Sequence, residues 1–456
     1  MKQPEPSHNR ELAYARVLLA HTEYPFFLTG KAGTGKSTFL REAISQIKKH
    51  FVVAAPTGIA AMHVGGVTLH SLFRLPTRPL MPNDKDIVKF RTDSPRYQVL
   101  KAMQTLIIDE ASMIRADVMD AIDASLRKNL GNPLPFAGKQ VLLVGDLFQL
   151  GPVVSAAYNE KELLERFYES PYFFDAHVFR NMAQQGMNLP AIELQQVYRQ
   201  HDQHFINLLD KIRLGTAGWE EINELNKCYV QNRSQLENQH FQITLCSSNH
   251  LADQINAQMI ARLPGAAFEY SASISGEFDA KLYPTDQPLQ LKVGAQVMFI
   301  RNDPEGRWVN GTLGEIYDLS KDCILVITED GEIHEVTRAT WENIRYTYDK
   351  EKDCITTEVL GSFTQYPLRL AWAITIHKSQ GLTFDKVNIN LGTGAFAPGQ
   401  LYVALSRCRT LAGITLSQKI HLRDVIVSPQ VQQFAKTFND LATIEQLLMK
   451  KRILPK

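Results

Sequence analysis

The chain has 456 residues, of which 44% are hydrophobic and 21% are charged, and its formal net charge is +1 at pH 7. This length exceeds one ordinary hydrophobic core, so we expect about two to four domains of a soluble globular protein. The near-zero charge favours no class of partner, because a basic groove can lie on a molecule that is neutral as a whole.

The first segment, Met1–Arg10, is polar and has no apolar core, so it does not form a secretory signal. No apolar run approaches the length that spans a membrane. The five cysteines are scattered without a C-x-x-C pair, which disfavours a zinc site and a disulfide framework and suits a reducing compartment. We therefore expect a cytoplasmic protein with no membrane partner, associated with the nucleoid if its source is bacterial.

A helix is predicted over Glu11–His21, followed by a short apolar strand from Phe26 that runs into a glycine-rich loop. The loop matches G-x-x-x-x-G-K-S between a strand and a helix, a context that favours phosphate binding over a plain glycine turn. Its glycines allow successive N–H groups to face one anion, and the next helix adds its dipole. Lys36 would reach the β- and γ-phosphates of ATP, and Ser37 would hold Mg²⁺. The predicted nucleotide-binding residues of the loop are Gly33, Thr34, Gly35, Lys36, Ser37 and Thr38.

Apolar strands are then predicted at 51–55, 105–108 and 140–144, with helices between them. Alternating apolar strands and helices predict a parallel sheet covered on both faces, the pattern of a RecA-like NTPase domain over residues 1–185. The proline-rich stretch 74–96 interrupts this pattern and is predicted to be a wedge-like excursion from the sheet.

Two acidic residues and a glutamine follow strands of this sheet, where ligands of open parallel sheets bind. Asp109 would complete the Mg²⁺ coordination, and Glu110 would polarise the attacking water. The alternative is an acidic pair that caps the next helix. Gln149 offers an amide that could sense the γ-phosphate, although by itself it is also an ordinary polar loop residue.

A second α/β unit is predicted over 186–300 and 364–430. It is interrupted at 301–363 by short alternating strands joined by tight turns, which predict a small antiparallel β-barrel. A helical tail is expected at 431–456. The second unit carries two arginines, Arg199 and Arg407, that could close over the γ-phosphate as arginine fingers do.

The sequence also contains a series of motifs in a fixed order. They read APTGIAA from Ala55, TLHSLF from Thr68, DEASM from Asp109, GDLFQLGPV from Gly145, TIHKSQGLTF from Thr375 and YVALSR from Tyr402. In this order they resemble the motifs of superfamily-one helicases, and most of all the Pif-type DNA helicases, relatives of the RecD-type enzymes. The resemblance covers about Phe26 to Arg409.

The resemblance implies an ATP-dependent helicase whose monomeric core moves 5′ to 3′ on single-stranded DNA and unwinds duplex or forked DNA. G-quadruplexes and RNA–DNA hybrids are further candidate substrates, and dimers on DNA are a candidate state. It implies that the insertion resembles a Src-homology-three barrel, and that Gln149, Arg199, Gly381 and Arg407 meet the γ-phosphate. It places in the strand-binding groove Thr57, His70, Ser247, Asn249, His377, Lys378 and Ser379. Thr68 and Phe73 are added as residues of the types that a DNA-binding groove needs.

Physical chemistry leaves some of these contacts open. A translocase without sequence preference needs hydroxyls, lysines, backbone N–H groups and a few rings for bases to stack on. Phe73 is nevertheless more typical of a core than of a stacking platform, and His70 is as typical of a buried, hydrogen-bonded histidine as of a DNA contact. Relatives carry an adenine-reading glutamine before the first strand, where this sequence has Ala13, with His8 or Asn9 as candidate substitutes.

Two other functions fit a phosphate loop. A nucleotide-switched binding or signalling protein would need one nucleotide domain and would have no use for the segment 377–381. A small-molecule kinase would need a lid and an acceptor motif, which we do not identify. The second α/β unit with its two arginines favours the helicase.

Overall fold

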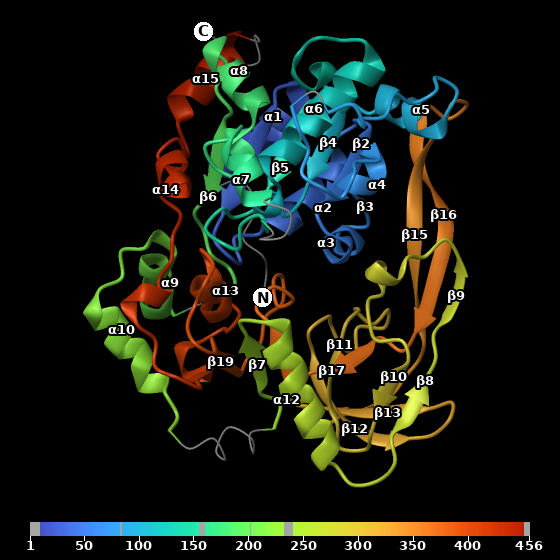
Figure 1. Ribbon diagram of the computed structural model, residues 1–456, viewed down its shortest axis with the longest axis vertical. Coiled ribbons are helices and arrows are strands. Elements are labelled where there is room, and N and C mark those ends of the chain that lie inside the picture. Colours follow the sequence, from blue (N-terminus) through green and yellow to red (C-terminus); the bar gives the residue numbers. More distant parts are fainter. Residues whose placement is uncertain (1–9, 83, 155–159, 201, 232–239, 451–456) are drawn as a thin grey trace.

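The computed structural model describes residues 10–82, 84–154, 160–200, 202–231 and 240–450. Two lobes, each built on a parallel sheet, lie one above the other, and an antiparallel insertion extends from the second lobe back along the first (Figure 1). The predicted fold class, two RecA-like domains with an antiparallel insertion in the second, is confirmed. Within the described residues, no helix is both long enough and apolar enough to cross a membrane.

The first lobe has a six-stranded sheet in the order β3-β2-β4-β5-β1-β6, with all neighbours parallel. Its strands are β1 (Phe26–Gly30), β2 (Phe51–Ala55), β3 (Val67–Thr68), β4 (Thr105–Ile108), β5 (Gln140–Val144) and β6 (Ala191–Leu194). Strand β1 illustrates why these strands are apolar throughout, because Phe27 faces one buried cluster while Phe26 and Leu28 face another.

Helices cover both faces of this sheet. One face carries α1 (Arg10–His21), α2 (Lys36–Gln46) and the C-terminal α15 (Leu441–Lys450). The other carries α4 (Leu69–Phe73), α5 (Pro95–Ala102), α6 (Ala116–Leu130), α8 (His177–Gln184) and α14 (Pro429–Ala435). Two further helices, α3 (Gly58–His63) and α7 (Glu160–Glu165), also belong to this lobe. The predicted helical tail therefore folds back onto the first lobe, where Phe434 stacks on Phe174 at 4.4 Å between ring centroids.

Strand β6 corrects the predicted start of the second unit at residue 186. It pairs in parallel with β1, so the first sheet continues to Leu194. A four-residue apolar strand carries no local mark of the sheet that it joins, and only the tertiary pairing decides this.

The second lobe has a four-stranded parallel sheet in the order β18-β7-β19-β20. Its strands are β7 (Ile243–Cys246), β18 (Ala373–Thr375), β19 (Val387–Asn390) and β20 (Ile414–Leu416). It packs against α9 (Gln203–Leu214), α10 (Trp219–Leu225) and α13 (Gln400–Ser406) through one buried cluster, with α12 (Asn249–Arg262) against a smaller one.

The insertion is larger than the predicted 301–363. Strands β11 (Gln296–Phe299) and β17 (Leu368–Leu370) fall within the bounds predicted for the second α/β unit, but they pair antiparallel with each other. They join β12 (Leu313–Leu319), β13 (Ile324–Thr328) and β14 (Ile333–Val336) in a five-stranded sheet. A second, two-stranded sheet of β8 (Phe268–Tyr270) and β10 (Leu289–Leu291) shares the same apolar core, which makes the unit barrel-like.

A long hairpin of the insertion reaches the first lobe. It consists of β15 (Ala339–Asp349) and β16 (Cys354–Gln365), with β9 (Ser273–Gly276) along one edge, and it extends to α5 (Figure 1). Near its tip the Tyr346 hydroxyl lies 3.3 Å from the backbone nitrogen of Val53, which donates to it. The insertion therefore bridges the two lobes at the edge of the first sheet.

The proline-rich stretch between Leu75 and α5 packs against the first lobe. Leu80 and Phe90 are buried in its core. Their backbone N–H groups donate to Asp117 at 2.8 Å and to Asn129 at 2.7 Å, both on α6. The stretch leaves the sheet as predicted, but it is fastened along α6, and its wedge role stays a prediction.

Candidate active site

The phosphate loop follows β1 and has the backbone that its glycines allow. Gly33 and Gly35 have φ angles of +81° and +85°, in the left-handed region where a side chain is unfavourable. The ammonium of Lys36 donates to the carbonyl oxygens of Gly30 at 2.7 Å and Lys31 at 3.1 Å. Burial lowers the pKa of Lys36. The loop thus encloses its own lysine, in a geometry where phosphate oxygens could replace the two carbonyls.

The acidic pair lies at the carboxyl end of β4. Asp109 accepts a hydrogen bond from the backbone N–H of Glu110 at 2.9 Å. Glu110 has φ 51° and ψ 43°, a left-handed conformation that costs a residue with a side chain roughly 1–2 kcal/mol. Burial, and next the charge of Asp109, raise the pKa of Glu110 to about 7. Strain and a raised pKa at one carboxylate are typical of a group held for chemistry.

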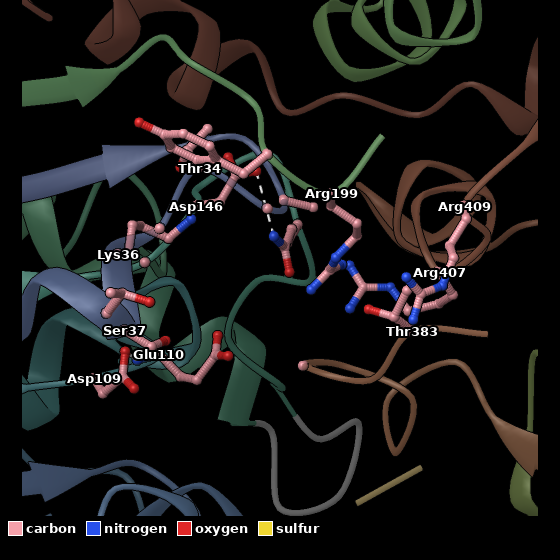
Figure 2. Close-up of a pocket in the computed structure, with 18 residues that line it drawn as sticks. Thr34, Lys36, Ser37, Asp109, Glu110, Asp146, Arg199, Thr383, Arg407 and Arg409 are labelled. Carbon is pink, nitrogen blue, oxygen red and sulfur yellow. Dashed lines mark hydrogen bonds between the residues drawn. The ribbon is translucent and has the colours of Figure 1, made fainter. Parts of the chain in front are cut away.

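The two predicted arginines come from beyond the first sheet and meet in one place. Arg407 ends α13 with 1% of its surface exposed. Its guanidinium donates to the carbonyl oxygen of Val403 at 3.0 Å and to the Ser406 hydroxyl at 2.8 Å. Burial, and next the charge of Arg199, lower the pKa of Arg407 to about 9. In Figure 2 the two guanidiniums lie side by side, across the cleft from Lys36.

All these groups line one cleft of about 470 Å³, a size that suits a nucleotide. The predicted nucleotide and catalytic residues that it brings together are Gly33, Thr34, Gly35, Lys36, Ser37, Thr38, Asp109, Glu110, Gln149, Arg199, Gly381 and Arg407. Their individual roles stay predictions. Figure 2 shows Ser37 on the same side of the cleft as Asp109 and Glu110.

Sequence reasoning missed several lining residues, namely Ala32, Gly145, Asp146, Tyr198, Thr383 and Arg409. Tyr198 and Arg409 stand next to or near the predicted arginines in the chain, and that adjacency was an available signal. Tyr198 is 43% exposed, and a Cβ on Gly35 would lie 3.7 Å from its ring. The candidate adenine readers His8 and Asn9 lie outside the described residues, while Ala13 lies on the surface of α1.

Two of the predicted DNA contacts have side chains that are buried in this structure. Phe73 is fully buried in the core of the first lobe and has no face for a base. Ser379 is also fully buried, and its hydroxyl donates to the carbonyl oxygen of Ile376 at 2.8 Å. Phe73 ends the short helix α4 and Ser379 lies in a turn after β18, and the sequence did not show which side of either is buried.

Three further candidates use their hydroxyls locally. Thr57 and Thr68 accept the backbone N–H groups of Ala60 and Ser71, as helix N-caps do. Ser247 donates to the carbonyl oxygen of Leu391 at 3.0 Å. These residues stabilise the backbone turns at the ends of β-strands. Any contact with DNA would therefore use the backbone N–H groups of those turns.

The remaining candidates are accessible. Asn249 and Lys378 are exposed and line a cavity of about 300 Å³ beside α12. His70 and His377 are partly buried, and this burial is the main reason that the pKa of each is lowered. Both imidazoles are therefore neutral at pH 7 and could meet a phosphate only as hydrogen-bond donors.

We compared the chain with protein families and with proteins of known function. A family model described as "PIF1-like helicase" matches residues 9–224, and one for the Pif1 DNA helicase 2B domain matches 278–319, inside the insertion. The ATP-dependent DNA helicase Pif1 of Bdellovibrio bacteriovorus is 31% identical over 91% of this chain and 89% of its own length. The chain belongs to the PIF1-like helicase family. Its predicted class, an ATP-hydrolysing helicase, is thereby confirmed.

Two solved structures of a PIF1-like helicase from Bacteroides agree with the fold to different degrees. The complex with ADP-AlF4 is 40% identical, covers 94% of this chain and 96% of that one, and superposes with a TM-score of 0.85. The structure bound to single-stranded DNA is 38% identical, covers 95% and 97%, and has a TM-score of 0.68. The present arrangement of lobes and insertion is closer to the first of these PIF1-like helicase structures.

Proposed function

We propose that this protein moves 5′ to 3′ along single-stranded DNA and unwinds duplex ahead of it, driven by ATP hydrolysis between its lobes. The observation that carries the proposal is the shared cleft, in which Arg199 and Arg407 face the phosphate loop. A nucleotide held by one lobe and contacted by Arg407, which follows α13 of the other lobe, ties hydrolysis to the distance between the lobes.

Within the cleft each group has a definite task. Lys36 neutralises the β- and γ-phosphates, and Glu110 takes a proton from the attacking water. Gln149 positions that water or the γ-phosphate from the loop after β5. Arg199 and Arg407 offset the charge that develops on the transferred phosphoryl group. The backbone of Gly381 closes the same end of the cleft.

Magnesium fits the donors at this site. Ser37 is exposed, and Asp109 adds a carboxylate, so both ligands are the hard oxygens that Mg²⁺ prefers. No group of three or more His, Cys, Asp or Glu side chains suited to a metal occurs in the described part of the chain. That agrees with an ion that takes its other ligands from the nucleotide and from water. When bound, it would neutralise charge on the phosphates.

The base of the nucleotide would lie on Tyr198. This ring stands over Gly35, close to the start of α2, and nearly half of it is exposed. Stacking on a tyrosine face accepts any base, which agrees with the lack of a matching adenine-reading glutamine. We therefore expect weak discrimination between ATP and other nucleoside triphosphates.

The DNA strand would cross the ends of both sheets. In the first lobe it would meet the turns at Thr57 and Thr68, and in the second Asn249 and Lys378. Single-stranded DNA, duplex and forked DNA are the proposed partners of a monomeric core that can pair on a fork. G-quadruplexes and RNA–DNA hybrids are further proposed substrates, and a cytoplasmic, DNA-associated location is proposed with them. The lower TM-score with the DNA-bound Bacteroides structure supports a rearrangement on binding.

The test combines ATPase activity, with and without oligo-dT, and unwinding of duplexes that carry only a 5′ or only a 3′ single-stranded tail. We expect oligo-dT to stimulate hydrolysis and only the 5′-tailed duplex to be unwound. An ATPase rate that is the same with and without oligo-dT would contradict ATP-driven movement on DNA. Unwinding of only the 3′-tailed duplex would contradict the proposed 5′-to-3′ polarity.

A further inference from the structure

Helix α9 of the second lobe places one arginine among groups of the first lobe. The Arg213 Nη2 atom lies 2.9 Å from Asp146 Oδ1 and 2.8 Å from Glu193 Oε1. Asp146 follows β5 and Glu193 lies in β6, so both carboxylates belong to the first lobe. The guanidinium also covers the ring of Phe148, 4.4 Å from its centroid. This is a contact between lobes made by charge and not only by apolar packing.

The ion pair is buried on both sides. The side chains of Arg213 and Asp146 are 2% and 0% exposed. Removing one partner of such a pair leaves an uncompensated buried charge, which is strongly destabilising. The same helix carries Lys211, whose ion pair with Glu221 at 2.5 Å lies on the surface, with the lysine side chain 52% exposed. Surface pairs contribute little, so Lys211 serves as a matched comparison.

Asp146 connects Arg213 to the nucleotide cleft. Its Oδ2 atom accepts a hydrogen bond from the side-chain amide of Gln149 at 3.4 Å. Its Oδ1 atom, which binds Arg213, also accepts the backbone N–H of Phe148 at 3.2 Å. Asp146 and Gln149 both line the cleft. One carboxylate therefore joins a second-lobe arginine to an amide that faces the nucleotide.

The loop that carries Gln149 is held by the second lobe at two further points. Leu150 is buried in the apolar core of that lobe. A Cβ on Gly399, which precedes α13, would lie 2.4 Å from the carbonyl oxygen of Phe148, so the loop rests directly on the start of that helix. The loop cannot keep its place if α9 and α13 shift relative to β5.

We propose that Arg213 is a positioning residue that fixes the Gln149 amide through Asp146 and so couples the second lobe to the nucleotide site. The inference rests on the proposed function, in which Gln149 meets the γ-phosphate or its water. Movement of α9 when DNA binds would then also move the Gln149 amide.

The test measures kcat and KM for ATP with saturating oligo-dT in Arg213→Met, Arg213→Lys and Lys211→Met, each alone and with Gln149→Ala. We expect Arg213→Met to lower kcat about tenfold with KM little changed, because an amide out of place weakens the transition state more than binding. Arg213→Lys should fall between, since an ammonium lacks the guanidinium's fork and binds two carboxylates less well. Lys211→Met should match the parent.

The double variants show whether Arg213 acts by positioning Gln149 or only by packing between the lobes. If Arg213 acts through Gln149, Arg213→Met should add less than about twofold to the loss in Gln149→Ala. Losses that multiply would overturn the inference and leave the proposed function standing. A Gln149→Ala enzyme with parental kcat would instead overturn the role of Gln149 itself, and the inference with it. Should Arg213→Met fail to fold by circular dichroism, Arg213→Lys and Asp146→Asn give the same comparison.

Discussion

Tyr198 donates its backbone N–H to the carbonyl oxygen of Gly33 at 2.8 Å, so the segment that carries Arg199 is hydrogen-bonded to the phosphate loop. The approach is so close that a Cβ built on Gly33 would lie 2.4 Å from the Cβ of Arg199. The loop and the first of the two arginines therefore form one rigid wall of the cleft. Only glycine fits at position 33, both for this contact and for its φ of +81°.

Gly33→Ala tests that contact. The added methyl group must displace either the loop or Arg199, so we expect the KM for ATP to rise at least about tenfold and kcat to fall as well. The measurement is steady-state ATPase activity with saturating oligo-dT. Gly65→Ala is the control, since Gly65 also has a positive φ but no atom within 4 Å of its Cβ position. Equal KM values in both variants would contradict the close approach.

Lys36→Ala should abolish turnover while leaving DNA binding largely intact. The ammonium is enclosed by the loop carbonyls of Gly30 and Lys31, whereas the exposed Lys378, which is proposed to meet DNA, lines a different cavity. ATPase activity checks the loss of turnover, and the affinity for fluorescent oligo-dT, measured on the same preparation, checks that DNA binding is retained. Lys378→Ala is the converse variant, with weaker DNA binding and a lower salt dependence of affinity. Normal unwinding by Lys36→Ala would contradict the assignment.

Arg407→Ala should lower kcat by something like 10³-fold, as loss of an arginine finger does. Because the guanidinium also binds Val403 and Ser406 in the second-lobe core, this variant should lose stability too. Lys386→Ala is the control, since its side chain lies outside the cleft, is 48% exposed and pairs with Glu329 on the surface. Comparing kcat with the melting temperature of both variants separates the two effects. A fully folded Arg407→Ala enzyme with parental kcat would remove the catalytic role.

The raised pKa of Glu110, about 7, predicts how activity depends on pH. A general base must be ionised, so kcat/KM should fall about tenfold per pH unit well below pH 7, and not only below the ordinary range of a glutamate. Steady-state kinetics from pH 5.5 to about 8.5 check this. A profile that stays flat down to about pH 5.5 would contradict the raised pKa.

Thermal unfolding gives an independent measure of the same group. Since the folded pKa of Glu110 is raised, the ionised form destabilises the fold, and this cost grows as the pH rises from the ordinary glutamate range through about 7. Glu110→Gln should therefore melt at a higher temperature than the parent at pH 8, with the difference shrinking toward pH 5. A difference that does not change with pH would show that burial of the carboxylate is not its cause.

The bridge from the insertion to the first lobe can be tested at its tip. Tyr346→Phe removes the hydroxyl that meets the backbone of Val53 while keeping the ring in the first-lobe core. We expect a loss of about 1 kcal/mol in the docking of the hairpin and no change in ATPase activity without DNA. Small-angle scattering and hydrogen exchange at β2 would detect a hairpin that leaves the lobe more often. Unchanged exchange at β2 would show that the hydroxyl does not hold the hairpin.

Much of the site was readable from the sequence because its chemistry is local. The phosphate loop, Asp109 and Glu110 directly follow apolar strands, and the carboxyl ends of parallel strands meet at one edge of a sheet. The errors fall where the outcome depends on distant partners. Strand β6 joins the first sheet and β11 the insertion, although each is a short apolar run like its neighbours. Phe73 and Ser379 turn inward because of the packing around them.

By itself the sequence determined the nucleotide chemistry, since a glycine loop, a lysine and two carboxylates at strand ends leave few other uses. The tertiary structure decided which sheet each short strand joins, which side chains of the groove are accessible, and that Arg213 of one lobe pairs with Asp146 of the other. The physical reason is the sequence separation over which each interaction acts. Backbone conformation and strand ends are set by residues a few positions apart, whereas burial and charge pairing are set by groups that only folding brings together.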